Sequence, residues 1–499
     1  MDERELYSIL LRTYNRWWVS GSIDDIQPYR RSDFYPLWEK LEGKLPLLIV
    51  GARQVGKTTL MKQLIEELLK KGIPKENILF VDLGDYAIKQ NADNPLLDTV
   101  KVYQQNVLKK DFHDCKDVYL FLDEIQKIDG WNEYAKNIYD AYKGKVKIIL
   151  SGSASLSITE MSEESLAGRY EKQAIVPMKF LEAFRFSRFI NAEKNKGSDP
   201  NSFEKVVKQN EELRALRSNL REGLEASLKN KDPKSFFDKL KEASNSSSIL
   251  ETELTGFYSE YLIKGGYPEI VITKEYAGCD RLLQTYLSDI IAKDMAEKVR
   301  SPEKVEALLY ILASNTGRKI SIERICNEAG IKKPTYYSYI ASLEKICLLY
   351  PLERLPTSLY GTQGGLAKMY VNDVGLRNSL VRKLNSFILS ENTGELQETI
   401  VCDHLLRLSF RWNNYTKPEL FYWSNKKEQE VDFVIRAKSF NADLPIEVKS
   451  EKTGDLKGIK DFLAQGKAPF GIVLTKDTLR YDDKEKLIFV PIVLFLLLC

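Results

Sequence analysis

The sequence is poor in the residues from which metal sites and disulfide frameworks are built. Its 499 residues include two histidines, His113 and His404, and six cysteines with no Cys-x-x-Cys pair. Zinc sites and disulfide frameworks need such residues at close, regular spacing. The sequence therefore predicts neither, and its scattered thiols favour a reducing, cytoplasmic location.

Long apolar segments are also absent. The N-terminus carries acidic residues and no uninterrupted apolar run, so it does not resemble a secretory signal. The apolar stretch 492–499 is far shorter than the roughly 20 residues that a membrane span needs, and it suits a buried final strand. No membrane association is expected.

No excess of charge of one sign points to a partner. The 74 basic and 71 acidic side chains leave a formal net charge of +3. Nucleic-acid binding depends on a local basic face, so this balance neither requires nor excludes it. A chain of 499 residues is too long for one hydrophobic core, and several domains are expected.

What the sequence does contain, from Leu45 on, is a strand, a glycine-rich turn and a helix in succession. The apolar run LPLLIVG leads into ARQVGKTT, and an amphipathic helix follows that stops near Gly72. Further apolar runs at 78–83, 118–122 and 146–150 alternate with helical stretches. This alternation predicts an α/β fold with a parallel sheet and helices on both of its faces.

The glycine-rich turn has the composition of a Walker A motif, which binds the phosphates of ATP. Glycines let the backbone N–H groups turn toward the phosphates, a lysine contacts the β- and γ-phosphates, and a hydroxyl binds Mg²⁺. The turn also lies at the start of a helix, whose N-terminus favours anions. The predicted nucleotide-binding residues of the loop are Gly51, Arg53, Gln54, Val55, Gly56, Lys57, Thr58 and Thr59.

The strand VYLFL ends in a pair of carboxylates, Asp123 and Glu124. One carboxylate of such a pair can hold Mg²⁺ while the other polarises the attacking water, so hydrolysis of ATP is expected as well as binding. Asp123 and Thr58 are the predicted Mg²⁺ ligands, and Glu124 and Lys57 are predicted to be catalytic. The alternative is a strand end that merely faces solvent, which the nearby Walker A motif disfavours.

Two further features follow the next strand. Ser151 and Ser153 lie at its carboxyl end, where ligands gather in parallel sheets, and one of them could sense the γ-phosphate. Arg169 could be a catalytic arginine finger that neutralises charge on the transferred phosphoryl group, either within its own subunit or across a homo-oligomer. An ordinary surface arginine is the alternative.

The motifs GARQVGKTT, LFLDEIQK, LSGSAS and SLAGRYEK, in this order, resemble those of bacterial and archaeal AAA-type ATPases with a C-terminal domain of unknown function. Further along, YLIKGGYPEIV, YLSDIIAKDM, KMYVNDVGL, GELQE, EVDFVI and IEVKS also resemble elements of that family. The resemblance implies ATP binding and hydrolysis by the N-terminal half, a winged helix in the middle and a restriction-endonuclease-like domain at the end. The polar stretch 191–248 departs from the family because it is longer than the family requires.

These patterns divide the chain into successive parts. We expect a helical N-terminal segment (1–40), a P-loop ATPase domain (41–190), a charged helical insertion (191–250), a helical region (251–302), a winged-helix-like domain (303–385) and a nuclease-like domain (386–499). In the winged-helix-like part, Lys332, Lys333, Thr335 and Tyr336 open the third helix after a turn at Gly330, as in a helix that reads DNA. A winged helix that docks a protein is the alternative.

The nuclease-like part contains the residue types of a PD-(D/E)XK centre. Asp432 lies in EVDFVI, and Glu447 and Lys449 lie in PIEVKS, at a spacing that fits a hairpin. Two carboxylates can hold Mg²⁺ near a scissile phosphate while the lysine positions water, and Glu398 on the preceding helix could complete the set. An active nuclease, a relic or binding fold, and charged strand ends that meet by chance all stay open, because a fold does not determine an activity.

The leading hypothesis is an ATPase that couples its nucleotide state to the binding or remodelling of nucleic acid, with DNA favoured. The alternatives are an ATP-gated switch or scaffold that binds a protein, with an inactive nuclease-like domain, and an ATP-licensed DNA nuclease. ATP and Mg²⁺ are the expected cofactors.

Overall fold

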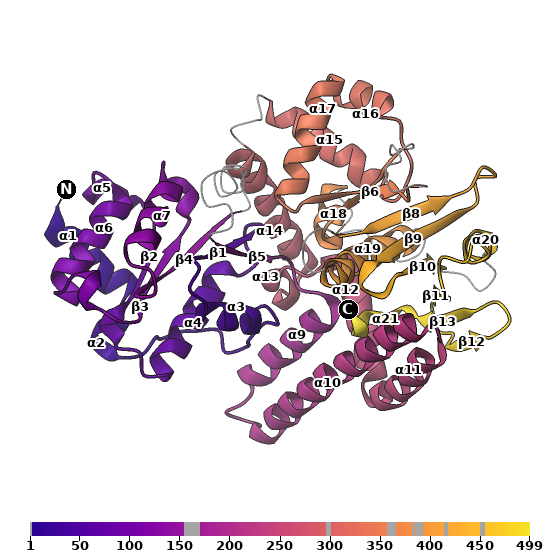
Figure 1. Ribbon diagram of the computed structural model, residues 1–499, viewed down its shortest axis with the longest axis horizontal. Helices are drawn as coiled ribbons and strands as arrows, with labels where there is room; N and C mark the ends of the chain where they lie inside the picture. The colour runs from indigo at the N-terminus through magenta and orange to yellow at the C-terminus, as the bar shows by residue number, and fades with distance from the viewer. Residues whose placement is uncertain are drawn as a thin grey trace. The chain divides into compact units, whose positions relative to one another are not determined.

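A computed structural model describes residues 2–153, 170–295, 301–356, 366–381, 384, 393–413, 418–449 and 455–499. The chain divides into two compact units (Figure 1). Unit 1 comprises Met1–Val176, Asp289–Lys298 and Lys345–Cys347, and unit 2 comprises Pro177–Ser288, Val299–Glu344 and Leu348–Cys499. Each unit is built around a sheet of its own.

Unit 1 contains a parallel sheet of five strands in the order β2-β3-β4-β1-β5. The strands are β1 Leu47–Gly51, β2 Ile78–Asp82, β3 Val118–Asp123, β4 Val146–Ser153 and β5 Glu171–Ile175. The central strands are buried almost throughout, as expected where helices cover both faces of a parallel sheet. The main helices after β1 are α4 Lys57–Lys70, α5 Tyr86–Asn91, α6 Pro95–Tyr103 and α7 Trp131–Ala141. The α/β fold predicted from the sequence is confirmed.

The aromatic N-terminal segment packs on this sheet. Its helices are α1 Glu3–Ile9, α2 Trp17–Ser20 and α3 Phe34–Leu41. The indole N–H groups of Trp17 and Trp18 both donate to the carbonyl oxygen of Ile78, at 3.3 and 2.8 Å. Trp18 also stacks on Tyr103, with 5.7 Å between the ring centroids. The buried indole N–H groups are thus hydrogen-bonded, and the ring of Trp18 also stacks on another aromatic ring.

Unit 2 begins with helices. They are α9 Phe180–Lys194, α10 Pro200–Asn230, α11 Lys234–Ser247, α12 Glu251–Lys264, α13 Pro268–Ile272 and α14 Tyr276–Asp289. The charged stretch after residue 191 is therefore helical, as predicted, and it is also packed. Leu220 and Leu224 of α10 and Phe236 and Leu240 of α11 are fully buried, so each helix turns an apolar stripe inward.

Three helices and two strands follow: α15 Pro302–Ser314, α16 Ile322–Ala329, α17 Lys333–Lys345, β6 Leu349–Arg354 and β7 Lys368–Val371. The strands β6 and β7 pair antiparallel, and β6 also pairs in parallel with β8. The pair that the sequence predicts as a wing is thereby one edge of a larger mixed sheet, in the order β12-β13-β11-β10-β9-β8-β6-β7.

The remaining strands of this sheet are β8 Leu420–Ser424, β9 Glu430–Ala437, β10 Ala442–Val448, β11 Gly471–Thr475, β12 Arg480–Asp482 and β13 Leu487–Pro491. The accompanying helices are α18 Val374–Leu380, α19 Thr393–Trp412, α20 Lys457–Leu463 and α21 Ile492–Leu498. Strand β9 runs antiparallel to both β8 and β10, whereas β10, β11 and β13 run parallel.

The apolar C-terminal stretch is a helix, so the prediction of a final strand at 492–499 is wrong. Helix α21 follows β13 directly after Pro491. A short, continuous apolar run has no periodicity that distinguishes a strand from a buried helix, and leucine favours helices. Across the described ranges, no helix is long and apolar enough to cross a bilayer.

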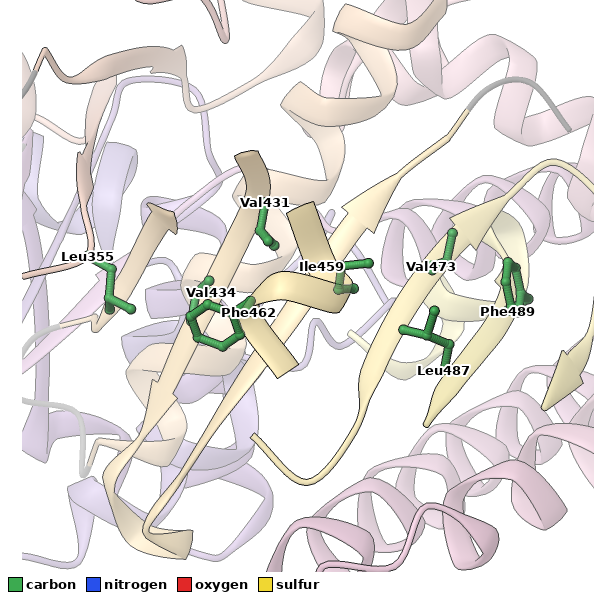
Figure 2. Packing of buried hydrophobic residues seen from close by; sticks show 8 residues of the cluster. All are labelled: Leu355, Val431, Val434, Ile459, Phe462, Val473, Leu487 and Phe489. Atoms are coloured by element: carbon green, nitrogen blue, oxygen red, sulfur yellow. The ribbon is translucent and has the colours of Figure 1, made fainter. Parts of the chain in front are cut away.

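One face of the mixed sheet packs beneath helix α20 (Figure 2). Ile459 and Phe462 of this helix lie in a buried cluster with side chains of β9, β11 and β13. The other members of the cluster are Leu355, Val431, Val434, Val473, Leu487 and Phe489. Burial of these apolar groups holds α20 against the sheet.

Phe462→Ala is expected to lower the free energy of unfolding of unit 2 by about 3–5 kcal/mol, because it removes a fully buried ring and leaves a cavity. Trp423 packs edge-on against Phe462, so denaturant unfolding can be followed by tryptophan fluorescence. The matched control is Gln465→Ala at an exposed position nearby, which should change the free energy by less than about 0.5 kcal/mol. Equal effects of the two substitutions would contradict this assignment of the core.

Candidate functional site

The predicted phosphate-binding loop joins β1 to helix α4. Gly56, just before the helix, has a φ of 97°, which residues with a side chain rarely adopt. Gly51 ends β1 so close to β5 that a Cβ there would lie 2.1 Å from the carbonyl oxygen of Ile175. The backbone thus requires glycine at both positions. The loop ends at the N-terminus of α4, where a bound anion is favoured.

Lys57 turns its side chain back into this loop. Its buried ammonium group donates to the carbonyl oxygens of Gly51 and Ala52, at 3.0 and 2.9 Å. Burial lowers the pKa of Lys57, and the nearby carboxylates Glu124 and Asp123 oppose this shift. A phosphate bound in the loop would offer the ammonium group a charged acceptor, which is stronger than two carbonyl oxygens.

The other predicted loop residues differ in exposure. Gln54 is exposed with a φ of 62°, Thr59 is half-buried and Val55 is fully buried. The carbonyl oxygen of Val55 accepts a hydrogen bond from the guanidinium of Arg31 at 2.5 Å, and the same group donates to the carbonyl oxygen of Val176 at 2.9 Å. Arg31, which the sequence analysis missed, therefore ties the loop to the end of β5.

Arg53 pairs with a carboxylate from a distant part of the chain. Its guanidinium donates to Oδ1 of Asp294 at 3.0 and 3.2 Å. Asp294 is nearly buried and lies in the π-helical turn Ile290–Asp294, within the segment that belongs to unit 1. The ion pair therefore connects the phosphate-binding loop to that segment. Asp294 belongs to the motif YLSDIIAKDM, but nothing in that motif indicated its pairing with Arg53.

Thr58 and Asp123, the predicted Mg²⁺ ligands, are in direct contact. The hydroxyl of Thr58 donates to Oδ2 of Asp123 at 2.6 Å. The other carboxylate oxygen of Asp123 accepts from the backbone N–H of Glu124 at 3.0 Å and from the hydroxyl of Ser151. Hydroxyl and carboxylate oxygens are hard ligands, which is the donor type that Mg²⁺ prefers, so this pair fits the ion.

Glu124 follows β3 in a left-handed conformation, with a φ of 53°. Positive φ is uncommon for a residue with a side chain, and such strain gathers at functional sites. One carboxylate oxygen of Glu124 accepts a hydrogen bond from the side-chain amide of Gln126 at 2.5 Å, and the same amide nitrogen lies 3.1 Å from the hydroxyl of Ser153. The predicted arginine finger, Arg169, lies outside the described residues.

Asp82 is a further carboxylate of this site that the sequence analysis missed. It ends β2 and pairs in parallel register with Asp123 at the end of β3. The pKa of Asp82 is raised to about 6, mainly by burial, with a smaller contribution from the charges of Asp123 and Glu124. The signal was present in the sequence, because both apolar strands end in aspartate and parallel neighbours end at the same edge of a sheet.

The structure also brings together the predicted nuclease-like residues of the β9–β10 hairpin. The carboxylate of Asp432 accepts from the backbone N–H of Val448 at 2.8 Å, and the backbone N–H of Asp432 donates to Glu447 at 3.3 Å. The ammonium group of Lys449 lies 2.7 Å from Oε1 of Glu447. Asp432, Glu447 and Lys449 therefore lie at one end of one hairpin, as their spacing predicts.

Glu398 on α19 faces the same centre. The hydroxyl of Tyr370 donates to its carboxylate at 3.3 Å. Burial, and after it the charge of Asp432, raise the pKa of Glu398 to about 8, and the same two causes raise the pKa of Glu447 to about 8. Among the residues that the structure describes, no three His, Cys, Asp or Glu side chains are grouped closely enough to hold a metal ion.

A buried lysine, Lys368 of β7, completes this centre and was not foreseen. It forms an ion pair with Glu430, as does Lys319. Burial alone would lower its pKa, but the charges of Asp432, Glu430 and Glu398 raise the pKa of Lys368 overall. Lys368 begins the motif KMYVNDVGL, but its role was not predicted, because β7 is joined to this sheet by strand pairing that the motif does not record.

Three known families each match a separate part of the chain. Residues 43–184 match an AAA domain, residues 256–386 match a domain of unknown function (DUF8612) and residues 393–495 match another (DUF4143). The first range contains the Walker A loop and the Asp123–Glu124 pair. The match and this geometry together identify an AAA-type P-loop domain and support the binding of ATP by an ATPase.

Two archaeal proteins are similar to most of this chain. One uncharacterized protein of Methanocaldococcus jannaschii is 24% identical over 396 residues, which cover 78% of this chain and 71% of the relative. A second from the same organism is 27% identical over 484 residues, which cover 94% and 89%. Among solved structures, a Walker-type ATPase of Pyrococcus abyssi is 14% identical, with 71% of this chain and 99% of that chain covered and a TM-score of 0.38.

The stability of unit 2 should depend on pH through Glu398 and Glu447. Their pKa values of about 8 in the folded protein lie above the ordinary 4.5, so the folded state keeps protons that the unfolded state has lost. The two protonated carboxyl groups contribute their full stability to the folded state below about pH 4.5, and this stability is lost as the pH rises through about 8. The free energy of unfolding should therefore fall between about pH 4.5 and 8.

Thermal unfolding between about pH 5 and 9, with a chelator present, measures this dependence. The double variant Glu398→Gln, Glu447→Gln should show a flatter profile, because its amides cannot ionise. An equally steep decline in the double variant would show that other groups cause it.

Proposed function

We propose that the protein is a Mg²⁺-dependent ATPase that couples its nucleotide state to nucleic acid, with DNA the favoured partner. The observation that supports hydrolysis most directly is the contact of Thr58 with Asp123 beside Glu124, at the N-terminus of the helix that follows the phosphate-binding loop. In the proposed mechanism this donor pair would hold the metal next to a carboxylate that acts on the attacking water.

Each residue then has a defined task. The loop residues and Lys57 bind the β- and γ-phosphates, and Thr58 and Asp123 hold Mg²⁺, which when bound offsets charge on the phosphates. Glu124 orients a water and accepts its proton. Ser151 keeps Asp123 in place through its hydroxyl, while Ser153 is the better candidate for a contact with the γ-phosphate, because its hydroxyl meets Gln126 and not Asp123.

Glu124→Gln should lower kcat for ATP by at least about 100-fold while the Kd for ATP changes little, because the amide keeps the shape but cannot accept a proton. Steady-state phosphate release and nucleotide titration measure the two quantities. The matched control is Glu133→Gln, an exposed residue in the first turn of α7, which should leave both unchanged. Full turnover in Glu124→Gln would remove Glu124 from the mechanism.

The surface of α17 supports nucleic acid as the partner. Gly330 ends α16 with a φ of 62°, and the chain turns there into α17. Of the four residues expected to open a helix that reads DNA, Lys332 and Lys333 are exposed, whereas Thr335 is half-buried and Tyr336 is buried. Tyr336 is therefore part of the core, and its neighbour Tyr337 is 57% exposed instead. Exposed lysines bind phosphates and an exposed ring can stack on a base, so the three side chains together suit a winged helix that binds DNA.

The double variant Lys332→Ala, Lys333→Ala should weaken DNA binding and reduce the slope of log K against log salt by about 2, because each lysine neutralises one phosphate. Any stimulation of ATP turnover by DNA should be reduced in parallel. The control is Lys205→Ala, Lys208→Ala, which removes the same charge from exposed positions of α10. Equal salt slopes for both variants, with ATP turnover indifferent to DNA, would favour the ATP-gated protein-binding switch.

An ATP-licensed DNA nuclease is a second candidate function. It is favoured by the grouping of Asp432, Glu447 and Lys449 on one hairpin with Glu398 nearby. The carboxylate oxygens suit Mg²⁺, but Lys368 already offsets their charge within the centre. Asp432→Asn distinguishes the alternatives: a nuclease would lose DNA cleavage and keep its ATPase, whereas a binding fold would show no cleavage to lose.

A further inference from the structure

Gln126 connects two functional groups of the ATPase site that lie on different strands. Its side-chain nitrogen is 2.5 Å from Oε2 of Glu124 and 3.1 Å from the hydroxyl oxygen of Ser153. Glu124 follows β3 and Ser153 ends β4, the adjacent strand. One amide group therefore bridges the predicted catalytic carboxylate and a predicted phosphate sensor.

The chemistry of the acceptors determines how this amide is oriented. An ionised carboxylate only accepts hydrogen bonds, so the NH₂ group of Gln126 and not its carbonyl oxygen must face Glu124. The NH₂ group has two protons, one for Glu124 and one for the hydroxyl oxygen of Ser153. Since Ser153 accepts from Gln126, its own hydroxyl proton is directed to a further acceptor, and a phosphate oxygen is a strong one.

The backbone around Gln126 is closely fixed. Gln126 lies in the short 3₁₀ turn Ile125–Lys127, where the backbone N–H of Lys127 donates to the carbonyl oxygen of Glu124 at 3.0 Å. Ile125 is fully buried, which anchors the turn. On the other side, a Cβ at Gly84 would be 3.5 Å from Cβ of Glu124, so the space around the glutamate is limited.

The carbonyl oxygen of Gln126 is buried and has no hydrogen-bond partner within the described part of the chain. Burying a polar atom without a partner is unfavourable. The amide nevertheless keeps this orientation, because turning it over would place its carbonyl oxygen against a carboxylate oxygen. The contacts with Glu124 and Ser153 therefore determine the conformation of Gln126.

We propose that Gln126 is a positioning residue of the ATPase site, which holds the Glu124 carboxylate in its reactive orientation and links that orientation to the contact of Ser153 with a phosphate. A phosphate oxygen that takes the hydroxyl proton of Ser153 strengthens the hydrogen bond from Gln126 to Ser153, because hydrogen bonds in a chain polarise one another. The amide, and Glu124 with it, is then fixed most firmly when the nucleotide carries the phosphate to be removed. This inference rests on the proposed ATPase function.

The test compares Gln126→Met, which keeps the length of the side chain and removes both donors, with wild-type protein. We expect kcat for ATP to fall on the order of 10- to 100-fold, the size of effect that misplacement of a reacting group by about 1 Å produces, while the Kd for ATP stays the same. Gln126→Asn, which keeps the donors on a shorter side chain, should recover part of the loss. Lys127→Met, an exposed neighbour in the same turn, is the control and should match wild type.

A double-mutant cycle separates positioning from a structural role. In a Glu124→Gln background, adding Gln126→Met should lower the residual rate no further, because Gln126 acts through Glu124. Independent losses that multiply, or loss of ATP binding in both Gln126→Met and Gln126→Asn, would overturn the inference.

Different results would contradict the proposed ATPase function and the proposed role of Gln126. If wild-type protein shows no turnover that depends on Glu124, the ATPase function is wrong and the inference falls with it. If wild-type protein hydrolyses ATP and Gln126→Met does so at the same kcat, only the positioning role of Gln126 is wrong.

Discussion

The carboxylate of Asp123 is the point on which the nucleotide site depends. It receives hydrogen bonds from Thr58 at the start of α4, from Ser151 on β4 and from the backbone of Glu124, so it joins three elements through one buried charge. A buried carboxylate is costly unless it is well satisfied, and donors from three elements satisfy it here. The same contacts bring the loop, the metal ligands and Glu124 to one edge of the sheet, where Asp82 and Gln126 join them.

Much of this site could be predicted because its functional residues lie within short sequence motifs. The loop requires glycine at Gly51 and Gly56 for reasons of backbone geometry, and the apolar strand before Asp123 places that residue at the sheet edge. Asp294 could not be predicted in the same way. It pairs with Arg53 across a sequence separation of 241 residues, and only the tertiary fold brings the two together.

In unit 2, the spacing of residues in the sequence predicted contacts between strands that are neighbours along the chain. The hairpin of β9 and β10 brings Asp432 to Glu447, as their spacing indicated. Lys368 reaches the same centre from β7, at the edge of the mixed sheet, and its motif KMYVNDVGL does not indicate that contact. The apolar end of the chain was wrongly predicted as a strand for a different reason. Helix α21 has no polar residues whose spacing would indicate a helix, so its sequence cannot be distinguished from that of a buried strand.

The central claim is that Thr58 and Asp123 form the Mg²⁺ site of an ATPase, and a Mg²⁺ titration of single-turnover ATP hydrolysis tests it most directly. With Asp123→Asn, the Mg²⁺ concentration for half-maximal rate should rise by at least about tenfold, because a charged ligand is replaced by a neutral one. ATP binding in the absence of Mg²⁺ should persist. The same Mg²⁺ dependence in Asp123→Asn as in wild-type protein would contradict this account of the site.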